Sequence, residues 1–378
     1  MGKHSSIVLI GPALPFRGGI SETQHQFALS LIKRGHHVQL WTFTKLYPQI
    51  IFPGSSQYST DYHDDGLNVS RKIHAYNPMT WKRVAQELNK LNPQIVVFRY
   101  YTPLLTFCYR GIMKLLDKHI LKIGFVDNWV AHEKRIYDGF LNKIFAQHID
   151  KFSALSENVA SQIASNIHSK PIWHNPHPIS KDLYPKIEKT KARKQLGWNQ
   201  SSNILLFYGI IRKYKGLDVL LRSLSRDLLD RENIELKVVG DCYQSKAYYR
   251  KLIKSNQLDQ KVQCYFQFAG KTLTQLVFSA ADLLVLPYRS ATQSGIIPLS
   301  YHYDLPLVVS DVEGIARIVK RDQSGLVSKH FPSDFYQTII SSLQKEKIES
   351  FKANILKSKS SYDWDYFTEQ WISFVNSS

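Results

Sequence analysis

Short apolar segments alternate with helical segments along almost the whole chain, and this alternation restricts the fold more than any other feature. In the N-terminal half each apolar segment runs through consecutive residues, so both faces of each strand are expected to be covered. Strands of this kind with helices between them form an open parallel sheet. The predicted strands are Ser6–Gly11, His37–Phe43, Gln94–Arg99, Leu121–Val126 and Phe152–Leu155, and the predicted helices are Thr23–Arg34, Trp81–Leu91 and Glu157 to about Ile167.

The pattern lapses between Lys170 and Asn203 and then begins again. Four prolines and the charged run IEKTKARKQLG fall there, as is typical of a linker. A chain of 378 residues is also longer than one hydrophobic core usually serves. We therefore expect one α/β domain in residues 1–185, a second in 186–360, and an aromatic-rich amphipathic helix in 361–378. The second domain's predicted strands are Asn203–Tyr208, Glu235–Val239, Val262–Phe268, Asp282–Leu286 and Leu305–Ser310, and its predicted helices are Gly216–Leu229, Tyr248–Gln257 and Leu273–Ala280.

The charge balance indicates an anionic partner. Lysine and arginine number 49 against 31 acidic residues, a formal net charge of +18. Nucleic acid is disfavoured, because no zinc-finger, RNP or helix-turn-helix pattern occurs. One segment mixes basic with apolar side chains, which fits either an anionic membrane surface or a buried helix with a solvated lysine face. Its members are Arg110, Lys114, Lys118, Lys122, Tyr100, Tyr101, Leu104, Leu105, Phe107 and Leu115.

Other signals favour a cytoplasmic protein without metal or cofactor. The three cysteines form no CxxC pair, as is typical of a reduced setting. The apolar run Ile7–Ile10 is too short for a signal-peptide core, and no stretch approaches the roughly 18 apolar residues of a membrane span. The pair His132–Glu133 lacks the second histidine of a zinc-binding HExxH motif. Any membrane contact is expected to be peripheral, at the inner face.

The first motif, Gly209-Ile-Ile-Arg212-Lys-Tyr-Lys215-Gly216, directly follows a predicted strand and opens a predicted helix. Glycine lets the backbone turn sharply and approach a ligand closely. Arginine binds two phosphate oxygens at once, and lysine adds a compact positive charge. The motif therefore indicates a phosphate site, and its alternative interpretation is a solvated basic turn.

The second motif, Tyr288-Arg-Ser-Ala-Thr292-Gln293-Ser294-Gly295-Ile296-Ile-Pro-Leu-Ser300, follows the strand DLLVLP. Its polar loop precedes an apolar helix, so free backbone amides are available to an anion. A helix cap made by threonine or serine uses the same amides, and the two interpretations are compatible.

The third motif, Pro15-Phe-Arg17-Gly18-Gly19-Ile-Ser21, follows the first strand. A pair of glycines there allows close approach to a ligand, but the GxGxxG spacing of a dinucleotide site is absent. The alternative is a flexible loop in which Ser21 caps the helix.

The fourth feature, Phe125-Val-Asp127-Asn128-Trp-Val-Ala-His132-Glu133, follows the strand LKIGFV. Polar side chains just beyond a strand end lie where active-site groups are commonly found. Asp127 can accept a proton or bind a hydroxyl, and His132 can do either near neutral pH. The alternative is that Asp127 or Asn128 caps a helix and His132 lies at the surface.

Taken in order, the GGI loop, GxxRxxKG, VVGD and AADLLVLPYRSATQSG resemble the retaining family-4 glycosyltransferases of the GT-B fold. The resemblance covers nearly the whole chain and is strongest over Ile204–Val309. It implies two Rossmann-like doubly wound domains facing across a cleft, with the last helix packing back on the N-terminal domain. The fourth feature is similar to the HNxxxHE segment of members that act on bacterial glycans, with Asp127 in place of the first histidine.

The resemblance also implies roles for the residues that match the family's motifs. Arg212 and Lys215, with Gly209, would hold the diphosphate of a nucleotide-sugar, assisted by the Ser294, Gly295 and Ile296 amides. Gly18 and Gly19 would allow a loop to close over it, while Asp127 and His132 would orient the sugar or the acceptor hydroxyl. Family members usually carry two glutamates eight positions apart, where this chain has Thr292 and Ser300. We therefore expect Thr292, Gln293 and Ser294 to supply polar groups to a sugar hydroxyl instead, and we count Ser300 among the donor-binding residues.

The implied reaction is retaining transfer of a hexose from a UDP- or GDP-sugar to a glycan or lipid-linked saccharide. Two alternatives stay open at this point. A GT-B isomerase or epimerase would act on the nucleotide-sugar without an acceptor, and a non-catalytic protein would only bind it.

Overall fold

The computed structural model describes residues 5–13, 16, 18–46, 66–130, 137–291, 294–329 and 332–377. Its contacts divide the chain into two compact units, which we describe separately. Unit 1 comprises Met1–Pro176 together with Asp363–Ser378, and unit 2 comprises His177–Tyr362. The sequence placed these two boundaries near residues 185 and 361.

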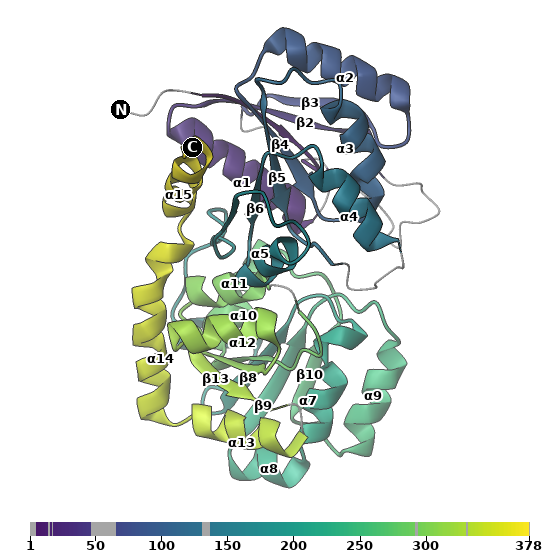
Figure 1. Ribbon diagram of the computed structural model, residues 1–378. Helices are drawn as coiled ribbons and strands as arrows, with labels where there is room; N and C mark the ends of the chain where they lie inside the picture. Colours follow the sequence, from purple (N-terminus) through teal and green to yellow (C-terminus); the bar gives the residue numbers. More distant parts are fainter. Residues whose placement is uncertain are drawn as a thin grey trace. The chain divides into compact units, whose positions relative to one another are not determined.

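Unit 1 is built on a parallel sheet with the strand order β3-β2-β1-β4-β5-β6-β7 in the described residues (Figure 1). The order reverses between β1 and β4, which makes the sheet doubly wound. Its strands are β1 (Ser6–Ile10), β2 (His37–Lys45), β3 (Val69–His74), β4 (Ile95–Tyr100), β5 (Leu121–Val126), β6 (Lys151–Ala154) and β7 (Ile172–His174).

Successive residues of each strand point to opposite sides of the sheet, so the apolar strands place apolar side chains on both faces. Helices cover both of these faces. On β1, Val8 and Ile10 belong to the core on one face, and Ile7 and Leu9 belong to the core on the other. The helices of unit 1 are α1 (Gly19–Lys33), α2 (Pro78–Leu91), η2 (Pro103–Leu105), α3 (Thr106–Met113), α4 (Asp138–Ala146), α5 (Glu157–Ala164) and α15 (Trp364–Asn376).

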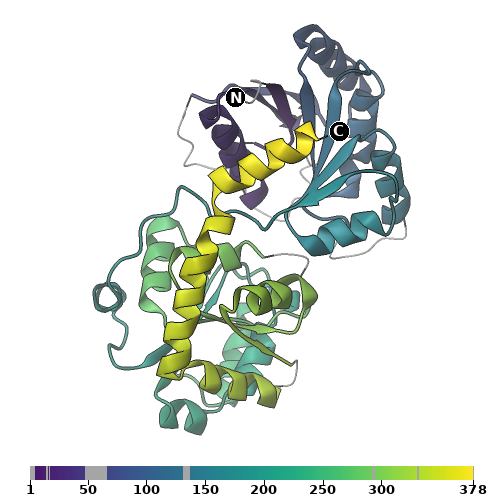
Figure 2. The ribbon, with the colours of Figure 1, turned by 60° about the vertical axis from the view of Figure 1, so that its left-hand side comes forward.

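The last helix, α15, lies against the sheet of unit 1 beside α1 (Figure 2). Trp371 is fully buried, and its ring meets that of Phe27 edge-on at 5.0 Å between centroids. Its indole N–H donates to Ser153 Oγ at 2.9 Å. The hydroxyl of Ser30 on α1 donates to the Trp364 carbonyl at 3.1 Å. Aromatic packing and these two hydrogen bonds therefore hold the end of the chain in the core of unit 1.

Unit 2 contains a second parallel sheet, with the order β10-β9-β8-β11-β12-β13 in the described residues. This order again reverses once, between β8 and β11. The strands are β8 (Asn203–Tyr208), β9 (Ile234–Val239), β10 (Val262–Tyr265), β11 (Leu283–Leu286), β12 (Leu307–Ser310) and β13 (Gly325–Ser328).

The helix predicted over Gly216–Leu229 is two helices. Leu224 is extended, and Ser225 starts the second helix by accepting a hydrogen bond from the Leu228 amide. A serine in this position satisfies an amide that would otherwise lack a partner. The helices of unit 2 are α6 (Lys189–Leu196), η3 (Lys213–Lys215), α7 (Leu217–Ser223), α8 (Arg226–Arg231), α9 (Lys246–Ser255), α10 (Lys271–Ala280), α11 (Ile296–His302), α12 (Glu313–Asp322), α13 (Pro332–Ser342), α14 (Lys345–Ser358) and η4 (Lys359–Tyr362).

The interval predicted as a linker, Lys170–Asn203, is partly regular structure. It contains β7 at the edge of the first sheet and α6 in the charged run. α6 forms because Arg193 turns inward, where its guanidinium donates to Asp282 at 2.6 Å and to the Ala280 carbonyl at 2.9 Å. The charged run predicted as part of a linker is thus a helix, which an ion pair attaches to Asp282, directly before β11.

Candidate functional site

The first two motifs follow β8 and β11, which are neighbours at the point where the strand order of unit 2 reverses. Ligands of open α/β sheets bind beyond the carboxyl ends of the strands at such a reversal. The loops after these two strands are also bonded to each other. The Arg289 amide donates to the Tyr214 carbonyl at 2.6 Å, and its guanidinium donates to the Lys213 carbonyl at 2.7 Å.

Two glycines make this close packing possible. Gly209 has a φ of +104°, and a Cβ built on it would lie 3.1 Å from the Lys215 Nζ and 2.8 Å from the Ile296 Cδ1. Gly216 has a φ of +69°, and its Cβ would lie only 1.9 Å from the Pro287 carbonyl oxygen. A side chain at either position would separate the loops or displace the lysine.

Lys215 is the most unusual charged residue of the first motif. It is only 8% exposed, and its ammonium has no hydrogen-bond or ion-pair partner within the described ranges. Burial lowers its pKa, and the neighbouring positive charge of Arg212 adds to this effect. The group that comes near is the ring of Tyr288, whose centroid lies 5.0 Å from Nζ. A buried ammonium without a counter-ion is costly, so it indicates a site for an anion.

Arg212 is exposed and supplies a second cation to the same loop. Its guanidinium lies 5.1 Å from the ring centroid of Tyr243. It has no ion pair among the residues that the structure describes. The nearby Arg289, in contrast, is neutralised by two hydrogen bonds to the Asp218 carboxylate, at 2.7 and 2.8 Å. The side chains of Arg212 and Lys215 therefore stay available to a ligand, and Lys215 differs from the exposed Lys213 of the same turn in being buried.

The loop after β11 brings Ser294 and Ile296 to this place. Ser294 is buried, and its hydroxyl accepts a long hydrogen bond of 3.4 Å from the Ile296 amide. Gly295 is exposed, and no described atom lies within 4 Å of the point where its Cβ would be. Ser300 is fully buried in α11 and donates to the Ile297 carbonyl at 2.7 Å, so its hydroxyl proton is already used within its own helix. Thr292 and Gln293 lie outside the described residues.

In unit 1, Gly18 and Gly19 lie at the start of α1, beyond the carboxyl end of β1. Gly18 is the helix cap, with a φ of +124°, and a Cβ on either glycine would meet nothing within 4 Å. The alternative in which Ser21 caps the helix is wrong. Ser21 lies inside α1, and no side chain makes the cap hydrogen bond. The helix begins earlier than predicted, because Gly18 turns the chain into it.

Asp127 follows β5 and is bound to Arg99 of β4 in the interior of unit 1. The Arg99 Nε and Nη2 each donate to a carboxylate oxygen of Asp127 at 2.5 Å. The guanidinium also lies 4.3 Å from the ring centroid of Phe125. Asp127 does not cap α4, which begins at Asp138. His132 and Glu133 lie outside the described residues.

Sequence reasoning missed three polar residues near the predicted ones: Arg99, Gln24 and Tyr288. Arg99 was taken only as the end of a strand, although a charged residue closing an apolar run is itself a signal. The Gln24 amide lies within 3.0 Å of the point where a Cβ of Gly11 would be, next to the Arg99 Cβ. Tyr288 was named as part of its loop and given no role.

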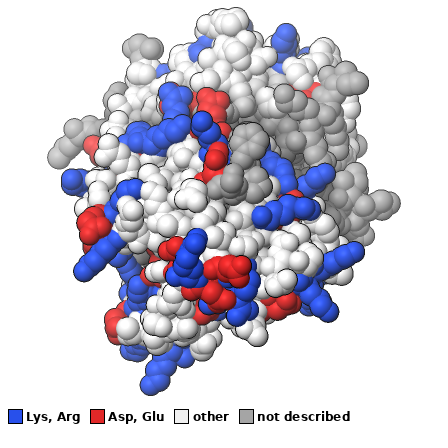
Figure 3. Space-filling model, turned by 90° about the horizontal axis from the view of Figure 1, so that it is seen from below, with Lys and Arg blue, Asp and Glu red and all other residues white. Residues whose placement is uncertain are grey.

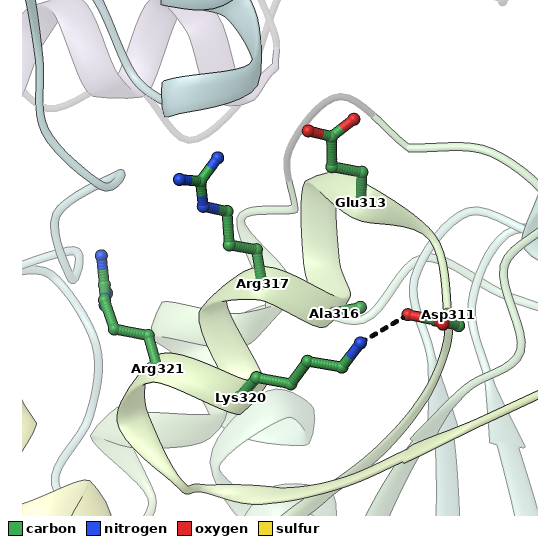
Figure 4. A pocket seen from close by; sticks show the side chains of 6 residues that line it. All are labelled: Asp311, Glu313, Ala316, Arg317, Lys320 and Arg321. Atoms are coloured by element: carbon green, nitrogen blue, oxygen red, sulfur yellow. Dashed lines mark hydrogen bonds and ion pairs between the residues drawn. The ribbon is translucent and has the colours of Figure 1, made fainter.

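A pocket with a volume of about 580 Å³ lies along α12, beyond the carboxyl end of β12 (Figure 4). Its lining is almost entirely charged and includes the 2.8 Å ion pair between Lys320 and Asp311. Both of these side chains are more than half exposed, so solvent screens the pair. The residues of the two phosphate motifs do not line this pocket, and we assign it no ligand.

Charged residues of both signs are mixed over the face drawn in Figure 3. The basic residues therefore form no continuous patch on this face. A surface that binds nucleic acid would be expected to carry such a patch. Within the described ranges, no helix is both long and apolar enough to cross a bilayer. The same ranges contain no group of three or more His, Cys, Asp or Glu residues suited to a metal ion.

Comparison with known proteins gives the family. Residues 188–357, which include both phosphate motifs, match the family described as glycosyl transferases group 1. Over these residues the chain is similar to the group 1 glycosyltransferases. This match confirms the family and the enzyme class that the motifs resembled.

The similarity extends beyond the matched domain. An uncharacterized glycosyltransferase of Methanocaldococcus jannaschii is 25% identical over 333 residues, covering 82% of this chain and 80% of its own. The solved structure of sucrose-phosphate synthase from Thermosynechococcus elongatus covers 98% of both chains with a TM-score of 0.76 at 16% identity. Anabaena HepE in complex with UDP and glucose covers 98% of this chain and 99% of its own, with a TM-score of 0.71 at 12% identity. These structural matches confirm the GT-B fold class of this glycosyltransferase.

Proposed function

We propose that this glycosyltransferase moves a hexose, with retention, from a UDP- or GDP-sugar to a glycan or lipid-linked saccharide. One observation carries the proposal. The ammonium of Lys215, beyond the carboxyl end of β8, is buried with no counter-ion among the described residues, and a diphosphate would supply the missing negative charge. The complex of Anabaena HepE with UDP and glucose supports a nucleotide-sugar donor for a chain of this fold.

The proposed chemistry needs positive charge at the leaving diphosphate. As the bond to the sugar breaks, negative charge builds up on the phosphate oxygens, and groups fixed in advance stabilise it most. Lys215 is fixed by burial, whereas the exposed Arg212 can bind two oxygens at once. The Ser294, Gly295 and Ile296 amides, with the Gly209 backbone, would complete the diphosphate site. No metal is required for this step, because the two cations already serve the diphosphate.

The sugar and the acceptor are assigned to unit 1 in this proposal. Gly18 and Gly19 would allow the backbone after β1 to approach the donor closely, since neither position carries a side chain. Asp127, held by Arg99, would accept a hydrogen bond from a hydroxyl of the sugar or the acceptor. His132, Thr292 and Gln293 stay candidates from the sequence for the same contacts.

We also propose that α3 and its flanks contact the anionic inner face of a membrane that carries a lipid-linked acceptor. The structure sorts the mixed segment into two parts, because Tyr100 and Leu105 are core residues. Phe107 and Leu115 are about half exposed, and Lys114 beside them is exposed. Apolar side chains next to lysines suit an interface between water and anionic lipid. Phe107→Ser should reduce sedimentation with phosphatidylglycerol vesicles, and unchanged sedimentation would contradict this contact.

The main test is a donor panel assayed with and without lipid-diphosphate acceptors. Free UDP or GDP released only when acceptor is present supports transfer. Conversion of the sugar without acceptor would support an isomerase or epimerase instead. Binding of a nucleotide-sugar with neither reaction would support a non-catalytic protein and contradict the proposal.

A further inference from the structure

Tyr288 is a buried polar residue next to the proposed diphosphate site. It follows β11 and Pro287 directly, is 2% exposed, and belongs to the core of unit 2. Its backbone is fixed, because the Ser310 hydroxyl donates to the Tyr288 carbonyl at 2.5 Å. Its own hydroxyl is buried near Ser294 and forms no hydrogen bond of normal geometry with the described residues. Burial raises the pKa of this hydroxyl, which keeps it protonated near neutral pH.

The face of this ring interacts favourably with the positive charge of Lys215. Nζ lies 5.0 Å from the ring centroid, within the range at which an ammonium is attracted to the negative face of an aromatic ring. Tyr214, next to the lysine in sequence, meets the same ring edge-on at 6.3 Å. The ring therefore lies between a fixed strand end and the turn that carries the lysine.

An aromatic ring and a carboxylate would serve this lysine differently. A carboxylate would accept hydrogen bonds from the Lys215 ammonium and neutralise its charge. Asp218 does this for the Arg289 guanidinium in the same pair of loops. A ring face reduces the cost of burying the ammonium and accepts no conventional hydrogen bond. The donors of Lys215 then stay directed at whatever anion enters the site.

We propose that Tyr288 is a positioning residue, whose ring keeps the Lys215 ammonium charged and aimed at the nucleoside diphosphate. The inference rests on the proposed function, since it assigns Lys215 to the diphosphate. The aromatic ring of Tyr288, and not its hydroxyl, interacts with the ammonium. A smaller aliphatic side chain would leave the ammonium uncompensated and free to turn away.

The experiment compares UDP and GDP binding by calorimetry in the full chain and in three variants. Tyr288→Phe should bind within about twofold of the parent, and Tyr288→Leu should lose about tenfold, because only the second removes the ring. Tyr303→Leu is the matched control, since Tyr303 is a buried tyrosine of the same core. Tyr303→Leu should destabilise the protein without changing affinity.

A pH series adds a readout that a purely structural role would not move. Removing the ring withdraws support from the charged form, so binding by Tyr288→Leu should fall at lower pH than binding by the parent. Parental affinity in Tyr288→Leu, an equal loss in Tyr288→Phe, or an equal loss in Tyr303→Leu would each overturn the inference. If the parent itself binds neither UDP nor GDP, the proposed function fails instead.

Discussion

Arg99 and Asp127 form a two-pronged ion pair in the interior of unit 1, with both bonds at 2.5 Å and side chains 1% and 4% exposed. The pair ties the end of β4 to the residue that follows β5. A buried charge that loses its partner is expensive, whereas removing both charges together is often tolerated.

Arg99→Met should therefore lower the free energy of unfolding by about 3 kcal/mol, because Asp127 would be left buried and unpaired. The double variant Arg99→Met, Asp127→Leu should recover part of that loss. Urea denaturation followed by circular dichroism measures both. Equal stability of Arg99→Met and the parent would show that the pair contributes little.

Lys215→Ala should reduce transfer by about 100-fold, since a charged group aimed at developing charge is worth several kcal/mol. Lys213→Ala is the control. Lys213 lies in the same turn but is exposed. The measurement is the steady-state rate with a saturating acceptor. Unchanged turnover in Lys215→Ala, or equal losses in the two variants, would remove Lys215 from the diphosphate site.

Binding of the nucleoside diphosphate should weaken as the pH rises. Burial lowers the pKa of Lys215 below the ordinary value of 10.5, and only the ammonium attracts phosphate. Affinity is then complete below the lowered pKa and falls as the pH passes through it. Calorimetry with UDP from neutral pH to about pH 10 tests this, with Lys215→Met as the control that should lack the transition. A flat profile in the parent would contradict the prediction.

The Lys215 ammonium should also make stability depend on pH, but stability should rise with pH where affinity falls. An unfolded lysine keeps its proton to higher pH than the buried Lys215, so the folded state gains stability from this residue as the pH rises. The parent should therefore become more stable relative to Lys215→Met over the interval in which it loses affinity. Parallel urea titrations of the two proteins measure this difference, and a constant difference across the interval would count against it.

Trp371→Ala should destabilise the protein by about 3 to 5 kcal/mol, the usual cost of removing a fully buried aromatic side chain. Tyr366→Ala on the same helix is the control, because Tyr366 is 43% exposed and should cost little. Thermal denaturation of the two variants provides the comparison. Equal stabilities would show that α15 contributes little to the core of unit 1.

The sequence predicted the buried strands well, because a continuous apolar run has few other places in a soluble fold. β8, NILLFY, was predicted with the bounds that the structure has. β3, VSRKIH, was missed because it is a polar strand at the edge of its sheet, where one side needs no apolar cover. α6 was missed because Arg193 looks solvated until its partner Asp282, 89 residues away, is known.

Some features of the candidate site were likewise predicted from the sequence, and others were not. Glycine and lysine spacing identified the loops, since backbone turns and charge are local properties. Neither the burial of Lys215 nor the ring of Tyr288 beside it follows from spacing, because the two residues lie in loops that follow different strands, β8 and β11. Ser300 illustrates the converse, because a residue aligned to a ligand position can still turn its hydroxyl into its own helix.

The assignment of α15 to unit 1 has a consequence for synthesis of the chain. Unit 2 is complete once Tyr362 has left the ribosome, but unit 1 still lacks Trp364, Phe367 and Trp371 at that moment. The domain that is translated first is therefore the one that can finish folding last. Until then, the apolar side chains around Phe27 that α15 covers stay exposed, and we expect a chaperone to bind them.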